Sequence, residues 1–290
     1  MLKFSVAPKR VAEAFIFACE AELQAPKPGN VHIFASGHGM ATQDFVDSAH
    51  VAAPFIADPN LTVGAKILAA TKATWAAVGQ NTNLGIILLC APLAQAALNA
   101  ATADLRLETS QLCKALGLDD ARDAFQAIQL ASPAGLGAST TDDVRAPAQT
   151  TLAAAMAQAA PRDRIAYQYA HDFCDIFDIG LKSLDRAREA GEDEILSTLT
   201  VYLAFLGSFQ DSHIARKYGP HRAQSVLLEA RSFIAQFSGA ARSQRIAAAL
   251  KWDAELKQKR LNPGTSADLT VATLFADKLG QSLANVPKNG

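Results

Sequence analysis

The sequence predicts an all-α fold, a single large multi-helix domain of about 12–14 helices without a sheet. Three observations carry this prediction. Alanine is abundant, and aromatic residues make up only 7% of the 290 residues. Runs of β-branched residues, which favour strands, are rare. Apolar residues recur at spacings of three and four through most segments, as they do on one face of a helix.

The first half of the chain reads as six helices. In the first, Val11, Phe15 and Ala18 share a face that turns polar at Glu22. The fourth is the most apolar and follows a polar run at 80–83. The predicted ranges are 8–24, 42–57, 62–79, 82–99, 108–116 and 120–130.

The second half reads as eight more helices, after a segment at 132–147 that is rich in glycine and proline. That segment holds specific polar residues, so we interpret it as a site loop within the single domain 1–290 and not as a linker. Later in the chain, Val226, Ala230 and Phe233 mark another apolar face. The predicted ranges are 147–159, 162–178, 180–190, 193–206, 208–217, 220–238, 241–260 and 266–285.

Composition excludes several classes of function. The formal net charge of −1 and the pI of about 6.6 argue against a nucleic-acid or membrane-surface binder. The apolar run 84–98 is interrupted by Pro92 and Gln95 and is too short to span a bilayer. Four scattered cysteines without a CxxC pair read as buried thiols in a reducing compartment. With no signal segment at the N-terminus, we expect a soluble cytoplasmic protein.

The turn at 262–268, Asn-Pro-Gly-Thr-Ser-Ala-Asp, opens the last predicted helix. Pro263 and Gly264 break the preceding helix, and Ser266 and Asp268 then lie near a helix N-terminus, which favours anions. This arrangement suits a phosphorylated ligand with Mg²⁺. Thr265 and Asp268 also match a capping pattern, so a purely structural cap is the alternative.

Other connections are built in a similar way. The segment 26–32, Pro-Lys-Pro-Gly-Asn-Val-His, is rigid and presents Lys27, Asn30 and His32, or simply ends a helix. The polar run 80–83 needs only one side chain to cap the helix that follows. Gly85 in the first turn of that helix costs about 1 kcal/mol relative to alanine, which a close approach by a ligand or another helix would explain.

Acidic residues mark three further candidates. Asp142 and Asp143 could bind Mg²⁺ in the loop before Arg145, or lie in a mobile surface loop. Asp211 lies beside an apolar stretch, where a carboxylate without a cation partner is costly. The acids at 172, 175 and 178 recur on one predicted helix face, which is most simply a solvated stripe, with a metal-facing stripe as the alternative.

In this order the motifs resemble those of the triphosphoribosyl-dephospho-CoA synthase family. The resemblance rests on Lys-Pro-Gly at 27–29, Asn-Thr at 81–82, the segment 211–213 and the segment 262–269. It runs from about residue 20 to the C-terminus. The family usually has an acid in the segment that follows Lys-Pro-Gly, and the segment from Gly37 to Met40 of this chain lacks it. Where the family usually has a His-Lys pair after Asn-Thr, this chain has Asn83-Leu84. These departures look more like a branch seen in archaea and in bacteria that use C1 compounds.

The resemblance implies transfer of the triphosphoribosyl group of ATP to the ribose 2′-hydroxyl of dephospho-CoA, with release of adenine and with Mg²⁺ on the triphosphate. It further implies an ATP site and a site for an acceptor like dephospho-CoA. On this basis we expect catalytic roles for Asp211, Asp268, His32 and His213, and metal binding by Asp143, Asp211 and Asp268. We expect the substrates to be bound by Lys27, Gly29, Asn30, Asn81, Thr82, Asn83, Gly135, Arg145, Arg216, Gly264 and Ser266.

Two alternatives stay open at this point. The chain could catalyse another nucleotide-dependent transfer in the synthesis of a C1-carrier cofactor. It could also be a non-catalytic helical protein that keeps a nucleotide pocket. Its many apolar helix faces are compatible with a homodimer, although no helix is marked as the interface.

Overall fold

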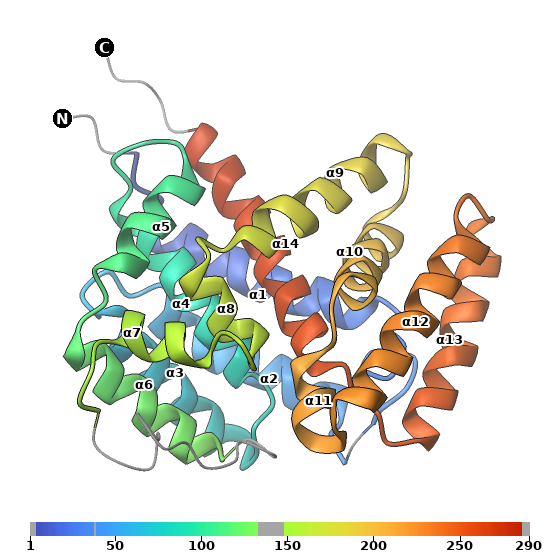
Figure 1. The fold of residues 1–290 in the computed structure, drawn as a ribbon. Helices are drawn as coiled ribbons and strands as arrows, with labels where there is room; N and C mark the ends of the chain where they lie inside the picture. Colours follow the sequence, from blue (N-terminus) through green and yellow to red (C-terminus); the bar gives the residue numbers. More distant parts are fainter. Residues whose placement is uncertain (1–3, 38, 133–147, 286–290) are drawn as a thin grey trace.

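The computed structural model describes residues 4–37, 39–132 and 148–285 (Figure 1). Within these ranges the chain forms 14 α-helices and one π-helical segment, and the described residues form no strand. Two isolated β-bridges, His32 with Ala35 and Gly37 with Met40, lie in the loop after the first helix. The prediction of an all-α fold is confirmed.

The helices follow the predicted order closely. They are α1 (Pro8–Gln24), α2 (Thr42–Ile56), α3 (Val63–Val78), α4 (Leu84–Asn99), α5 (Leu105–Lys114), α6 (Leu118–Ala131), α7 (Leu152–Ala159), α8 (Arg164–Ala170), η1 (Ile176–Gly180), α9 (Leu181–Glu189), α10 (Glu194–Ser208), α11 (Ser212–Tyr218), α12 (Pro220–Phe237), α13 (Arg242–Gln258) and α14 (Gly264–Ala284). No helix in the described part of the chain is long and apolar enough to cross a membrane.

The predicted helix 162–178 differs most from the structure. Helix α8 ends at Ala170, and the backbone then turns through Asp172 and Phe173, whose φ angles are 54° and 53°. Left-handed residues of this kind end a helix because L side chains rarely adopt that conformation. The chain resumes as the π-helical segment η1 and continues into α9.

The three acids at 172, 175 and 178 therefore do not form one stripe, and each has its own partner. The Ser110 hydroxyl donates a hydrogen bond to Asp172. Arg164 donates two hydrogen bonds to the buried Asp175. Arg106 likewise donates two to Asp178. Neither the solvated stripe nor a metal-facing stripe is realised. Each carboxylate has a cationic partner, since Lys114 Nζ also lies 3.2 Å from Asp172 Oδ1.

Helices α4 and α14 form the centre of the packing. Almost every residue of α4 is buried, which explains why it is apolar on all sides. Helix α14 crosses the middle of the view in Figure 1 and packs against α1, α4 and α10. The N-terminal ends of α4 and α14 come together, because Gly85 of α4 contacts Asp268 of α14.

The apolar side chains form two clusters. The larger is built by α1 to α8 with η1, α9 and most of α14, and the smaller by α10 to α13. In the smaller cluster the rings of Phe233 and Trp252 stack with centroids 5.4 Å apart, joining α12 to α13. Helices α10 and α14 contribute to both clusters, so the site described next lies where the two meet.

Candidate active site

The Lys-Pro-Gly loop near the N-terminus packs directly on the turn near the C-terminus. A Cβ atom at Gly29, whose φ is +82°, would lie 2.8 Å from the Leu261 carbonyl oxygen and 2.9 Å from Pro263 Cδ. Only glycine allows this approach. The Asn30 amide donates to Asn262 Oδ1 at 2.8 Å across the same contact. Two motifs separated by more than 200 residues therefore form one structure.

Helix α13 holds this loop through Asp253. The Gly29 amide donates to Asp253 Oδ1 at 2.9 Å, and Lys257 Nζ lies 2.9 Å from Asp253 Oδ2. His32 Nε2 lies 3.2 Å from the same oxygen, but the atoms are not aligned for a hydrogen bond. Burial lowers the pKa of His32, whose side chain is fully enclosed. Asp253 opposes this shift in the pKa of His32, and the enclosed ring lies among the residues that support the loop.

Lys27 is also enclosed and does not face solvent. Its Nζ donates to the Val31 carbonyl at 2.7 Å and lies 3.0 Å from Glu22 Oε1. Burial lowers the pKa of Lys27 and raises the pKa of Glu22, and the attraction between the two opposes both shifts. Lys27 neutralises a carboxylate of α1 in this structure.

Hydrogen bonds connect the polar run 80–83, before α4, to helix α2. Asn81 Oδ1 accepts the Leu84 amide at 3.2 Å, and the Thr82 hydroxyl pairs with the Ser48 hydroxyl at 2.6 Å. The Asn83 amide donates to the Ser48 carbonyl at 3.4 Å. The N-cap residue, Asn83, makes no side-chain capping bond, so the expected cap is not formed, and Thr82 and Asn83 instead fix the start of α4 against α2.

The first turn of α4 carries Gly85 because Asp268 lies against it. A Cβ atom at Gly85 would be 2.0 Å from Asp268 Oδ2, so no side chain fits there. Gly264 plays a similar part beside His213, where a Cβ atom would meet Nδ1 at 3.1 Å. Both glycines therefore permit close approach of a candidate catalytic side chain.

Asp211 is fully engaged by donors from two helices. Its Oδ1 accepts the His213 and Ile214 amides at the start of α11, and its Oδ2 accepts the Ser266 amide and hydroxyl at 2.8 and 2.9 Å. The expectation of a cation partner for this buried acid is wrong among the described residues, because its partners are N–H and O–H groups. Asp211 joins the start of α11 to the start of α14.

Thr265 does not cap the last helix. Helix α14 begins at Gly264, and Pro263 at the N-cap makes no side-chain hydrogen bond. The Thr265 hydroxyl instead pairs with the Ser212 hydroxyl at 2.9 Å and accepts the His213 amide. The structural-cap interpretation of the turn is therefore wrong, since its hydroxyls connect α14 to α11.

Arg216 of α11 supplies positive charge to the site. It forms an ion pair with Asp163, the residue that caps α8 through the Ile165 and Ala166 amides. Its buried Nε has no hydrogen-bond partner within the described part of the chain. The positive charge of Arg216 also acts on Asp268, where it opposes the rise in pKa described next.

The Asp268 carboxylate is the least satisfied acid of the site. It is partly exposed and makes no hydrogen bond or ion pair with any described residue. Burial, followed by the charges of Asp211 and Glu22, raises the pKa of Asp268 well above its usual value, against the opposing effect of Arg216. Such a group can accept or hold a proton near neutral pH.

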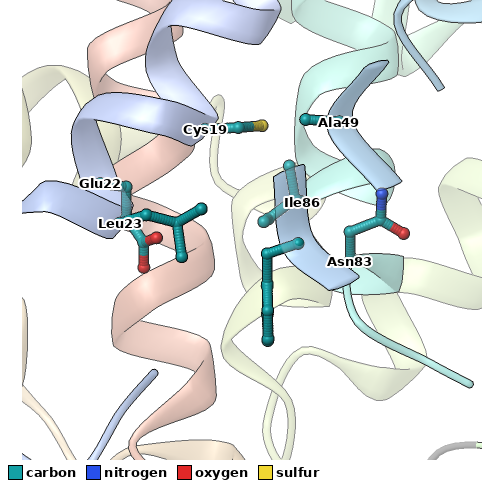
Figure 2. A pocket seen from close by; sticks show the side chains of 7 residues that line it. Cys19, Glu22, Leu23, Ala49, Asn83 and Ile86 are labelled. Carbon is teal, nitrogen blue, oxygen red and sulfur yellow. The ribbon is translucent and has the colours of Figure 1, made fainter. Parts of the chain in front are cut away.

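A small pocket opens between α1, α2 and α4 (Figure 2). In Figure 2, Cys19 and Glu22 come from α1 on one side, and Ala49 of α2 faces Cys19 across the gap. Asn83 and Ile86 come from the start of α4. The complete lining is Cys19, Glu22, Leu23, Phe45, Ala49, Asn83 and Ile86.

The structure thus gathers most of the predicted site residues around the starts of α4, α11 and α14. Three of them, Gly135, Asp143 and Arg145, lie outside the described residues. Among the described residues, no group of three or more His, Cys, Asp or Glu side chains could hold a metal ion.

Sequence reasoning missed three acids that organise the site: Glu22, Asp163 and Asp253. Glu22 gave a signal, since it continues the buried face of Val11, Phe15 and Ala18. Asp163 and Asp253 gave none, because single acids in helices and at their ends are common on exposed surfaces.

Comparison with known proteins agrees with this arrangement. A family model described as ATP:dephospho-CoA triphosphoribosyl transferase (CitG) matches residues 8–286. A solved structure from Archaeoglobus fulgidus, provisionally assigned as a triphosphoribosyl-dephospho-CoA synthase, is 20% identical with a TM-score of 0.61. The match covers 79% of this chain and 95% of that one, and it shows a shared fold. No curated protein matches the sequence.

The family match extends over α1 to α14 and includes both motifs that meet at Gly29 and Leu261. The family is one of transferases, as the resemblance implied. The chain therefore belongs to the ATP:dephospho-CoA triphosphoribosyl transferase family.

Proposed function

We propose that this chain transfers the triphosphoribosyl group of ATP to the 2′-hydroxyl of dephospho-CoA and that Asp268 is the carboxylate at the reacting carbon. The observation that supports this role is the open, unpaired Asp268 carboxylate against Gly85. Family membership supports the reaction itself.

In this reaction the acceptor hydroxyl attacks C1′ of the ATP ribose. The new C1′–O bond forms as the C1′–N9 bond to adenine breaks, through a centre with oxocarbenium character. The hydroxyl proton passes to Asp268, whose raised pKa suits a base working near neutral pH. Adenine leaves and takes up a proton, for which His213 beside Gly264 is the candidate donor. His32 is enclosed beside Asp253, which suits a supporting role.

In this proposal Asp211 holds the starts of α11 and α14 together and does not contact substrate. Its oxygens already accept four donors, so binding a metal or a proton would cost these hydrogen bonds. The amides of Gly264 and Ser266 likewise donate within the chain, to Asn262 and Asp211. We therefore assign the triphosphate chiefly to Arg216, with its unpartnered Nε.

Mg²⁺ fits this site as an ion that arrives with the triphosphate. Mg²⁺ is usually held by one or two carboxylates together with phosphate oxygens, and with Asp268 assigned to the acceptor hydroxyl, phosphate oxygens would supply most of its ligands. When bound, the ion would neutralise phosphate charge. The predicted ligand Asp143 remains a candidate for a second contact.

The test is to incubate the protein with ATP, Mg²⁺ and dephospho-CoA and to measure free adenine. We expect adenine only when dephospho-CoA is present, and none from Asp268→Asn with an unchanged circular dichroism spectrum. Unchanged activity in that variant would remove Asp268 from the mechanism. Adenine with another acceptor would support a different cofactor-building transferase, and nucleotide binding without turnover would support a non-catalytic protein.

A further inference from the structure

Glu22 places a buried carboxylate in the wall of the pocket between α1, α2 and α4, and the reaction as described leaves it unused. The residue is 4% exposed and lines the pocket opposite Asn83 (Figure 2). Lys27 is its ion-pair partner among the described residues, at 3.0 Å from Oε1. A carboxylate offers about four acceptor positions, so a single lysine does not use them all.

The remaining walls of the pocket are apolar. They come from Leu23, Phe45, Ala49 and Ile86, with the thiol of Cys19 beside them. A ribose carries hydroxyls on several sides and a phosphate carries charge, so each would leave polar atoms against these walls. A planar base instead has apolar faces and a polar edge. The pocket is small, which suits the edge of such a ring and not a whole nucleotide.

The pocket also lies near the reacting end of the site. Burial, followed by the charges of Glu22, Glu20 and Asp268, raises the pKa of the Cys19 thiol in its wall. Asn83 and Ile86 of the pocket wall flank Gly85 in the chain, and the Asp268 carboxylate lies against Gly85. A base held here would have its ribose directed toward the start of α14.

We propose that this pocket binds the adenine of ATP, with Glu22 accepting an N–H of the exocyclic amine and Asn83 facing the ring from the opposite wall. The proposal rests on the proposed function and names the residues that select the base. A charged Glu22 attracts the amine of adenine and repels the carbonyl at the same position of a 6-oxopurine. The ion pair with Lys27 opposes the rise that burial causes in the pKa of Glu22 and so favours its charged form.

The experiment compares ATP with ITP, which differ at this position of the base. Dissociation constants measured by calorimetry should favour ATP in the wild type. In Glu22→Gln we expect ATP affinity to fall about tenfold or more, because a hydrogen bond to a charged group is lost. ITP should lose less or gain, since the glutamine amide can donate to its carbonyl. Glu20→Gln, an exposed acid of the same helix paired with His50, is the matched control and should bind both nucleotides like the wild type.

Equal binding of ATP and ITP by the wild type, or an equal loss for both in Glu22→Gln, would overturn the proposal. If Glu22→Gln folds poorly, the double variant Glu22→Gln/Lys27→Met removes both buried charges and should show the same change in preference. Asn83→Leu should weaken ATP binding both in the wild type and in the double variant. A wild type that prefers ATP but releases no adenine would refute the proposed function and leave the base pocket standing. Adenine release without a preference for ATP would refute the pocket alone.

Discussion

The Asp268 carboxylate lies against the backbone of Gly85, so close that a Cβ atom on Gly85 would fall 2.0 Å from Oδ2. This contact joins the start of α4 to the start of α14. It also sets where the open carboxylate points, because Asp268 has no hydrogen bond within the described residues to hold it. Gly85 is therefore a positioning residue for the proposed base.

Gly85→Ala should lower kcat for adenine release by about 100-fold or more, because a displacement of a reacting group by about 1 Å has that cost. KM for ATP should change much less. The variant should also lose about 1–3 kcal/mol of stability through overpacking, although alanine normally favours a helix. Gly280→Ala in α14, the helix of Asp268, is the control, since nothing lies within 4 Å of the added Cβ atom. Normal kcat in Gly85→Ala would show that the contact does not position Asp268.

Asp268 should also make stability depend on pH. Its pKa is raised in the folded protein, so the folded state binds more protons than the unfolded state between the usual carboxyl pKa and the raised value. Its contribution is thus fully present in acid and is lost as the pH rises through the raised pKa. Asp268→Asn should therefore gain stability relative to the wild type as the pH goes from 5 to 8, measured by urea unfolding. A difference that stays constant over this range would argue against a raised pKa.

Much of this fold follows from the sequence because helix starts and stops are local. Most helices, including α4, end within a few residues of the predicted ranges. The break after Ala170 was missed because it depends on tertiary contacts. Arg164 holds Asp175 by two hydrogen bonds, and the turn at Asp172 brings the two together.

The site was predicted by residue type more successfully than by role. Glycine lowers helix stability, which marked Gly85 in the sequence as a position of close approach. In the structure the group that approaches it is the Asp268 carboxylate. Lys27 and Asp211 were expected to contact substrate or metal, and both are instead satisfied inside the chain. Sequence shows which polar residues are available, but their partners lie in distant helices and are fixed only by folding.

Asp211 should contribute more to stability than an ordinary helix cap. Asp211→Ala removes four hydrogen bonds at the junction of α11 and α14, and we expect a loss of about 3 kcal/mol in the free energy of unfolding. Asp104→Ala is the control, because Asp104 is an exposed cap of α5 that accepts the Leu107 amide, and it should cost about 1 kcal/mol. Urea unfolding of both variants gives the comparison. Similar losses would mean that the contacts with Ser266 add nothing.

The Glu22–Lys27 pair should show the asymmetry of buried charges. Lys27→Met leaves Glu22 without its partner in the interior and should cost about 3–5 kcal/mol. Glu22→Gln/Lys27→Met removes both charges and should recover much of this loss, because no unpaired charge remains. Lys9→Met breaks the exposed pair with Glu13 on the same helix and should change stability by less than about 1 kcal/mol. If the double variant is no more stable than Lys27→Met, the cost comes from lost packing and from the hydrogen bond to Val31, and the ion pair is not its source.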